Sequence, residues 1–260
     1  MQEIFRISDF TFQYPETAAY ALSGVTLSIE QGDFLVLCGP SGCGKSTLLR
    51  QLKTTLAPYG VKTGEISFCG KPLSGVPNRT QASEIGFVQQ APEEQIVTDK
   101  VWHELAFGLE SLGYETPVIR RRVAEMASFF GIQDWFYRDV ASLSGGQKQL
   151  LNLAAVMVMQ PKVLILDEPT SGLDPIGTRE VKELIRRLAA EGMTILVTSH
   201  QLFDMQDVCS RVAILSHGEV VGGGAVTDIV AAAADKRHAL EDYFFSRLAG
   251  RDTRVPPAKT

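Results

Sequence analysis

The sequence predicts an α/β fold, in which a core of buried strands is interrupted by a helical insertion. The apolar runs at residues 34–38, 163–166 and 193–198 are typical of strands buried on both faces of a parallel sheet. Residues from about 93 to 155 instead have helical periodicity, with glycines as breaks between the segments. The chain has 260 residues, of which 45% are hydrophobic, so it can bury a sizeable core.

Two further strands are predicted before the buried strand at residues 34–38. Residues 4–14 and 25–29 alternate between apolar and polar side chains, as expected for a sheet with one solvated face. Tyr14 ends the first of these strands, just before Pro15. Its ring could stack on the flat face of an adenine base, or it could pack on neighbours as an edge-strand residue, and the residues alone leave both interpretations open.

A glycine-rich loop follows the strand at residues 34–38. Its sequence, G-P-S-G-C-G-K-S-T, matches G-x-x-x-x-G-K-[ST], the pattern of loops that wrap the phosphates of a nucleoside triphosphate. Glycines let backbone N–H groups converge on a phosphate, Lys45 adds a cation, and the Ser46 hydroxyl is placed to bind Mg²⁺. A glycine-rich turn with a solvated lysine is the alternative, and the later motifs argue against it. The predicted binding residues are Gly39, Pro40, Ser41, Gly42, Cys43, Gly44, Lys45, Ser46 and Thr47.

Three predicted strands end in polar side chains. The chain places an amide at Gln90, two carboxylates at Asp167 and Glu168, and an imidazole at His200. Because ligands of parallel sheets gather at the carboxyl ends of the strands, Asp167 can hold Mg²⁺, and Glu168 can orient a water molecule and accept its proton. An acidic turn and a capping histidine are ordinary alternatives, and Gln90 is a weak indication when taken alone.

The motif L-S-G-G-Q occupies residues 143–147 at the start of a predicted helix. A serine followed by two glycines leaves free N–H groups at a helix N-terminus, which is a second candidate anion site. The same residues also make a simple N-cap, and the motif alone favours this simpler interpretation.

Composition limits the classes of function that remain. The net charge of −5 argues against a protein that binds nucleic acid through a broad basic surface. The four cysteines show neither metal-site spacing nor a disulfide framework, so we expect reduced thiols, as in the cytoplasm. Neither a signal-peptide pattern nor a long apolar run is found, so work at a membrane would require a partner that supplies the span.

In this order, the motifs resemble those of the nucleotide-binding subunits of ATP-binding-cassette (ABC) systems. The combination of L-S-G-G-Q between a phosphate loop and a D-E pair is highly specific to that family. The resemblance covers about residues 1–223 and implies a phosphate-loop NTPase (RecA-like) core, an antiparallel β subdomain and a helical subdomain inserted at about residues 93–155. Residues 224–260 are then a C-terminal helical extension and tail.

The resemblance also implies roles for individual residues, with ATP and Mg²⁺ as cofactors. Tyr14 would stack on adenine, and Ser46, Gln90 and Asp167 would serve the metal. Glu168 would act on the attacking water, and His200 would contact the γ-phosphate, so that Glu168, His200 and Gln90 form the catalytic set. Four residues of one protomer would close over ATP held by the other: Ser144, Gly145, Gly146 and Gln147.

A finer resemblance concerns residues 93–97 and 104–110, which are similar to the segment after the Gln loop in energy-coupling-factor (ECF) ATPases. Those subunits drive uptake of vitamins or transition-metal ions through a transmembrane scaffold and a substrate-binding membrane protein. They work as homodimers or as pairs of related ATPases, bound peripherally to the cytoplasmic face of the membrane. No nucleic-acid partner is implied. Trp102 and His103 depart from the acids usual at these positions.

Two alternative functions stay open at this level. The chain could serve another ABC transporter class, including exporters, or it could be a soluble ABC ATPase for protein assembly. The sequence does not identify the substrate, the direction of transport or the choice between homodimer and heterodimer.

Overall fold

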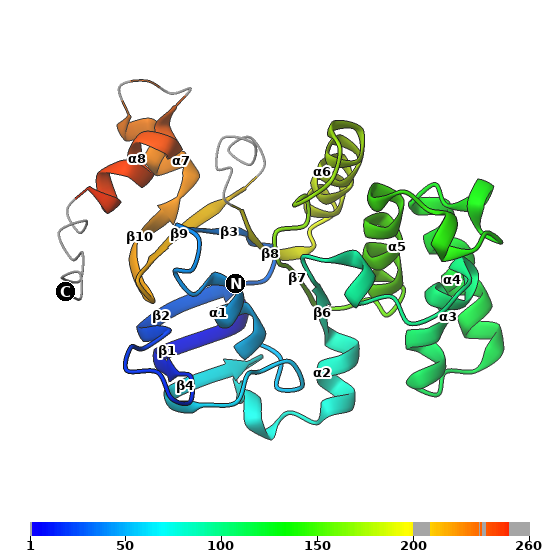
Figure 1. The fold of residues 1–260 in the computed structure, drawn as a ribbon, viewed down its shortest axis with the longest axis horizontal. Helices are drawn as coiled ribbons and strands as arrows, with labels where there is room; N and C mark the ends of the chain where they lie inside the picture. Colours follow the sequence, from blue (N-terminus) through cyan, green and yellow to red (C-terminus); the bar gives the residue numbers. More distant parts are fainter. Residues whose placement is uncertain (1, 200–208, 234, 236–237, 250–260) are drawn as a thin grey trace, which may run out of the picture.

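The computed structural model describes residues 2–199, 209–233, 235 and 238–249. Within these residues, the central sheet has six strands in the order β10-β9-β3-β8-β7-β6 (Figure 1). The strands from β9 to β6 are parallel to one another, and β10 pairs antiparallel with β9 at one edge. The strands are β3 (Phe34–Cys38), β6 (Ile85–Val88), β7 (Val163–Leu166), β8 (Thr194–Thr198), β9 (Arg211–Ser216) and β10 (Glu219–Ala225).

A second, antiparallel sheet lies beside the first (Figure 1). In the described part of the chain it has four strands in the order β2-β1-β4-β5. These strands are β1 (Glu3–Gln13), β2 (Leu22–Glu30), β4 (Val61–Phe68) and β5 (Lys71–Pro72). β1 has the alternating burial expected for a half-solvated strand, and its apolar side chains face the hydrophobic cluster shared with the central sheet.

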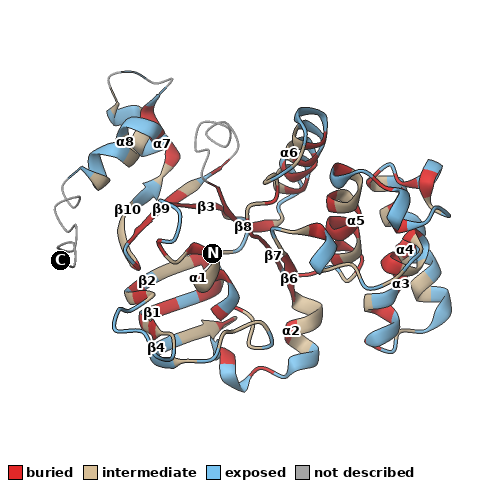
Figure 2. Ribbon diagram, in the orientation of Figure 1, coloured by how far each residue is buried: buried red, intermediate tan, exposed pale blue. Residues whose placement is uncertain are grey.

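Side chains of β3 alternate between two hydrophobic clusters, because successive residues of a strand point to opposite faces. Leu35 and Leu37 pack with α1 (Lys45–Gln51) and the antiparallel sheet. Phe34 and Val36 pack on the other face, in the cluster that includes the helical insertion. Figure 2 shows the central strands buried almost throughout. The strand that precedes the glycine-rich loop is therefore fixed from both sides.

The helices of the insertion lie at one end of the molecule, beyond α6 (Figure 1). They are α3 (Val101–Ser111), α4 (Thr116–Phe129) and α5 (Gly145–Met157), with short 3₁₀ turns at Pro92–Glu94, Gln133–Trp135 and Val140–Ser142. α5 packs on both α3 and α6 (Pro175–Ala190), so it joins the insertion to the core. α2 (Asn78–Glu84), which the sequence pattern does not predict, packs against β6 and is followed directly by it.

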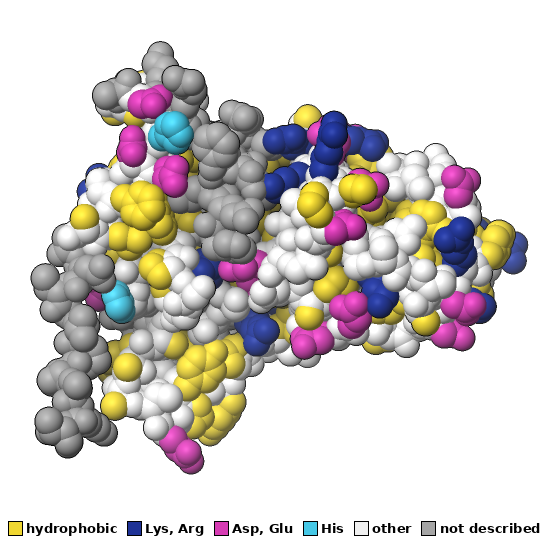
Figure 3. Space-filling model, turned by 45° about the horizontal axis from the view of Figure 1, so that its top comes forward, with side chains coloured by type: hydrophobic (Ala, Val, Ile, Leu, Met, Phe, Trp, Pro, Cys, Tyr) yellow, Lys and Arg dark blue, Asp and Glu magenta, His cyan; other side chains and the backbone are white. Residues whose placement is uncertain are grey.

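Two short helices follow β10, namely α7 (Val226–Ala232) and α8 (Ala239–Leu248). Leu240 of α8 is buried in the main hydrophobic cluster, and Tyr243, Phe244 and Leu248 are packed against it. In the described residues, no helix is both long enough and apolar enough to cross a bilayer. Figure 3 shows basic side chains interspersed with acidic and apolar ones on one face, with a basic group near its upper edge.

Candidate active site

The glycine-rich loop takes the chain from β3 into α1, and its conformation requires glycine. Gly44 has φ 108°, and a Cβ there would lie 2.6 Å from the carbonyl oxygen of Ala21. At Gly39 a Cβ would lie 2.1 Å from the carbonyl oxygen of Leu215. Distances this short are steric overlaps, so both positions exclude a side chain and the loop keeps its backbone open toward the ligand.

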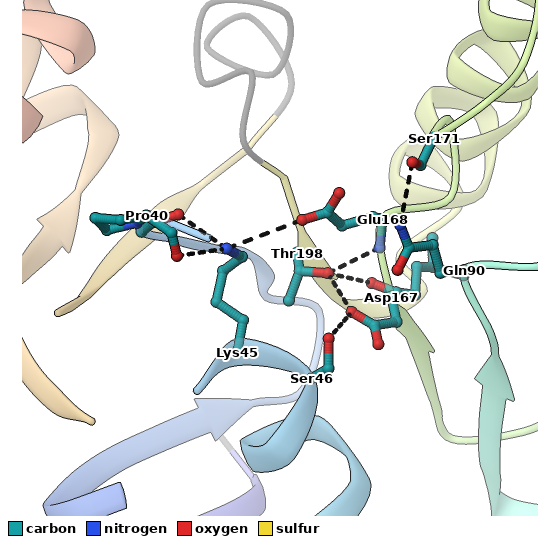
Figure 4. A network of polar contacts seen from close by, with 10 residues as sticks. Pro40, Lys45, Ser46, Gln90, Asp167, Glu168, Ser171 and Thr198 are labelled. Atoms are coloured by element: carbon teal, nitrogen blue, oxygen red, sulfur yellow. Dashed lines mark hydrogen bonds and ion pairs between the residues drawn. The ribbon is translucent and has the colours of Figure 1, made fainter. Parts of the chain in front are cut away.

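Lys45 holds its ammonium group at the mouth of this loop (Figure 4). The side chain is only 6% exposed, and Nζ donates to the carbonyl oxygens of Gly39 and Pro40 at 2.8 and 3.2 Å. A carboxylate oxygen of Glu168 lies 3.9 Å from the same nitrogen. The loop therefore orders a positive charge where the sequence predicts the phosphates.

Ser46, Asp167 and Thr198 form the next part of the network (Figure 4). Ser46 Oγ donates to Asp167 Oδ1 at 3.0 Å, and Thr198 Oγ1 donates to the same oxygen at 2.8 Å. Asp167 is 2% exposed, because β7 delivers it to the closed end of the loop. Hydroxyl and carboxylate oxygens are the ligands that Mg²⁺ prefers, so this donor set fits the ion. The described residues contain no cluster of three or more His, Cys, Asp and Glu side chains that could hold a metal.

Glu168 follows Asp167 in an unusual backbone conformation. Its φ is 45°, in the left-handed region that residues other than glycine rarely adopt. Its backbone N–H donates to Thr198 Oγ1 at 2.8 Å. The turn directs the Glu168 side chain into the space above the loop, where it lines the cavity together with Lys45.

A cavity of about 360 Å³ brings half of the predicted site residues together. Its lining, taken from the described residues, is Tyr14, Ala21, Ser41, Gly42, Gly44, Lys45, Ser46, Thr47, Gln90 and Glu168. Asp167 lies directly behind Ser46. His200 lies outside the described residues. The L-S-G-G-Q residues 143–147 are not among the described residues that line this cavity.

Tyr14 has features of both interpretations of its role. It lines the cavity, and its Oη is 3.0 Å from Thr47 Oγ1 at the end of the loop. Its ring also packs edge-on against Phe12, with the ring centroids 4.9 Å apart. The side chain is therefore held at the cavity wall by a hydrogen bond and by an aromatic contact.

Gln90 is connected to other elements of the site. Its Nε2 donates to Ser171 Oγ at 3.1 Å, so it contacts the loop that follows Glu168. The segment after Gln90 is tied to α5 at two points, where Asn152 Nδ2 donates to the Pro92 carbonyl at 3.0 Å and Lys148 pairs with Glu93 at 3.0 Å. The loop that carries Gln90 is thus joined to the helix that begins with L-S-G-G-Q.

Ser144 forms the N-cap of α5, as the simpler interpretation of L-S-G-G-Q predicts. Its Oγ accepts the N–H of Gln147 at 3.2 Å, and Gln147 Oε1 accepts the N–H of Ser144 at 3.0 Å, which completes a capping box.

Behind the cap, α5 and α6 approach closely at two glycines. A Cβ on Gly146 would lie 2.9 Å from the Cα of Gly177. Spacing in the sequence does not reveal this contact.

Burial keeps two cysteines beside the loop protonated. It raises the pKa of Cys38 to about 12, and it also raises the pKa of Cys43 inside the loop itself. None of the four cysteines, all of which lie in the described part of the chain, forms a disulfide. Because the thiolate is the reactive form, the thiols of Cys38 and Cys43 are poor nucleophiles at neutral pH.

Together, the loop, the buried lysine and the two strand-end carboxylates define a nucleoside-triphosphate site of the phosphate-loop class. Residues 22–171 match the model of the ABC transporter family, which is more than half of the chain. The chain therefore belongs to the ABC transporter family. Residues 22–171 therefore belong to an ATPase domain of the ABC type.

The names of similar proteins agree with this family assignment. A putative ABC transporter ATP-binding protein of Bacillus thuringiensis subsp. konkukian is 46% identical over 226 residues, which is 86% of this chain and 41% of that protein. An energy-coupling factor transporter ATP-binding protein of Methanospirillum hungatei is 34% identical over 86% of this chain and 56% of its own length. The chain thus spans about half the length of these relatives or less.

Solved structures confirm the predicted fold class. CbiO1 from Clostridium perfringens, described as part of the ABC transporter complex CbiONQ, superposes with a TM-score of 0.80 at 29% identity, covering 96% of this chain and 97% of that one. The ADP conformation of an ATP-binding cassette of an ABC transporter gives 0.74 at 22% identity over 94% of this chain and 99% of that one, which shows the fold alone. The predicted similarity to ECF ATPases is likewise confirmed by these findings.

Proposed function

We propose that the chain is the ATP-hydrolysing subunit of an ECF-type importer and that it works as one half of a dimer. The observation that carries this proposal is the cavity that gathers Lys45, Ser46, Gln90 and Glu168 but leaves out residues 143–147. A site divided in this way requires a second copy, or a related cassette, to supply the L-S-G-G-Q motif. Residues 1–223 form the cassette in this proposal, and residues 224–260 form its extension.

The residues at the cavity divide the binding and hydrolysis of ATP between them. The N–H groups of residues 39–47 and the Lys45 ammonium bind the β- and γ-phosphates, and Tyr14 supports the adenine ring. Ser46, Asp167 and Gln90 would hold Mg²⁺, which would supply positive charge beside the phosphate oxygens. Glu168 orients the attacking water and accepts its proton. We place His200 at the γ-phosphate on the family resemblance alone.

The second protomer completes the site from the opposite side. Ser144 accepts a hydrogen bond in its capping box and keeps its hydroxyl hydrogen to donate to a phosphate oxygen. Gly145 and Gly146 add backbone N–H groups at the start of α5. Two nucleotides held in this way would close the dimer, and cleavage of ATP would release it.

The membrane partner is proposed from the relatives. Similarity to an energy-coupling factor ATPase and to CbiO1 supports a transmembrane scaffold with a substrate-binding membrane protein, and a location on the cytoplasmic face of the membrane. A vitamin or a transition-metal ion is the proposed cargo. The tie between the Gln90 loop and α5 offers a route by which closure of the dimer reaches that scaffold.

Glu168→Gln tests the dimer. The exchange removes the base and keeps the phosphate loop, so we expect ATP binding to persist while turnover falls about 10²-fold or more. The ATP-bound variant should elute as a dimer in size-exclusion chromatography with light scattering, and the ADP-bound variant as a monomer. Turnover at the parent rate would refute the role of Glu168.

The transporter assignment is tested by purifying the tagged chain from detergent-solubilised membranes of its native cells. We expect it to retain a polytopic membrane protein of the scaffold type. Recovery in a complex of soluble proteins alone would favour the protein-assembly alternative, and recovery with an exporter subunit would favour the other transporter class.

A further inference from the structure

Thr198 stands at the carboxyl end of β8, next to the two carboxylates that end β7. The side chain is completely buried, and β8 pairs with β7 in parallel through Leu166 and Val197. This pairing places the Thr198 hydroxyl beside the peptide that joins Asp167 to Glu168 (Figure 4).

One hydroxyl group serves both carboxylate residues. Thr198 Oγ1 accepts the backbone N–H of Glu168 at 2.8 Å and donates its own hydrogen to Asp167 Oδ1, also at 2.8 Å. A second acceptor, the carbonyl oxygen of Leu166, is farther away at 3.4 Å. The bond to the carboxylate is the shorter one and is assisted by charge, so it determines where the hydroxyl points.

The two hydrogen bonds of the Thr198 hydroxyl constrain the Asp167 carboxylate and the Glu168 backbone. Asp167 Oδ1 accepts from Ser46 and from Thr198, which fixes the rotation of this carboxylate behind the metal-binding hydroxyl. The N–H that Thr198 accepts belongs to the residue with φ 45°. A left-handed residue other than glycine persists only where its surroundings hold it, and here the hydroxyl holds its peptide.

We propose that Thr198 is a positioning residue for ATP hydrolysis. Its hydroxyl orients the Asp167 carboxylate behind the metal site and holds the Glu168 backbone, which directs the Glu168 side chain, so both carboxylate residues depend on one hydroxyl group. This inference rests on the roles proposed above for Asp167 and Glu168. Thr198 is fully buried and is not among the described residues that line the cavity.

The test compares four variants of Thr198 and Thr194. Thr198→Val keeps the shape of the side chain and removes the hydroxyl, whereas Thr198→Ser keeps the hydroxyl. Thr194→Val is the matched control, because Thr194 is also buried on β8 and its hydroxyl accepts the N–H of Gly32 at 2.9 Å, at the opposite end of the strand. The control loses a hydrogen bond from a backbone N–H to a buried threonine hydroxyl, as Thr198→Val does, at a position away from the site.

The measurements are kcat and KM for ATP, the Mg²⁺ concentration that gives half-maximal activity, and the binding of a fluorescent ATP analogue with and without Mg²⁺. Thermal melting reports folding. For Thr198→Val we expect kcat to fall about tenfold or more and the Mg²⁺ requirement to rise about threefold or more. Binding of the analogue without Mg²⁺ should stay within about twofold, while its gain on adding Mg²⁺ should shrink.

Thr198→Ser should restore kcat and the Mg²⁺ requirement to within about threefold of the parent. Thr194→Val should lower the melting temperature and leave both values unchanged. Thr198→Ala, which cannot clash with its surroundings, must repeat the result of the valine variant. A folded Thr198→Val or Thr198→Ala protein with parental kcat and Mg²⁺ requirement would overturn the inference.

Glu168→Gln, measured alongside, separates the two proposals. If it is inactive while Thr198→Val is fully active, only the positioning role fails. If Glu168→Gln itself hydrolyses ATP at the parental rate, the assignment of the catalytic carboxylate fails instead.

Discussion

Replacing Gly146 with alanine tests the contact between α5 and α6. The new Cβ would lie 2.9 Å from the Cα of Gly177, whereas carbon atoms in contact prefer about 3.5–4.0 Å. The two helices must therefore separate by about 0.6 Å or more, and backbone cannot move aside as a flexible side chain can. Overpacking of this kind costs about 1–3 kcal/mol, which corresponds to a melting temperature lower by roughly 2–6 °C for a chain of this size.

Gly145→Ala is the matched control. It lies in the same motif and the same first turn of α5, but its Cβ would meet only the Cδ2 atom of Leu173, at an ordinary 3.6 Å. Both variants gain helix propensity from alanine, so the difference between them isolates the contact with α6. The assay is thermal unfolding of the nucleotide-free protein, followed by circular dichroism. A Gly146→Ala protein that melts at or above the temperature of Gly145→Ala would refute the reasoning.

The remaining predictions concern two lysines. Lys45→Ala removes the ammonium group held by the loop and should weaken ATP binding about tenfold or more in a nucleotide titration. The control is Lys62→Ala, on the exposed part of β4, which should bind ATP as the parent does. Parental affinity in Lys45→Ala would contradict the role assigned to Lys45. For Lys53, burial lowers the pKa from 10.5 to about 8, so the folded state disfavours its charged form, and the free energy of unfolding should rise by about 2–3 kcal/mol between pH 7 and pH 10. Urea titrations at the two pH values measure the free energy of unfolding of the parent and of Lys53→Met, which should lack this rise. An equal pH dependence in the two proteins would contradict the lowered pKa of Lys53.

The parts of the site that the sequence predicts are those built by short stretches of chain. The glycine-rich loop is one such part, because its motif occupies consecutive residues and the Lys45 ammonium donates to the Gly39 and Pro40 carbonyls of the same stretch. Asp167 and Glu168 are another, because an apolar strand that ends in carboxylates delivers them to the ligand edge of a parallel sheet.

The parts that the sequence does not predict depend on contacts between distant segments. Thr198 looks like the last polar residue of a core strand until β7 and β8 are paired, and only then does its hydroxyl meet Asp167. The close approach of Gly146 and Gly177 depends on how α5 crosses α6. The bond between Gln90 and Ser171 joins two loops that are 81 residues apart in the chain.

The two ties between α5 and the segment after Gln90 have a mechanical consequence. Asn152 and Lys148 lie one turn apart on α5, and they bond to the Pro92 carbonyl and the Glu93 carboxylate at two separate points. One bond alone would let the loop rotate about it, whereas two bonds also couple the orientation of the loop to that of the helix. A rotation of α5 is therefore passed to the Gln90 loop, and a displacement of that loop is passed to the helix.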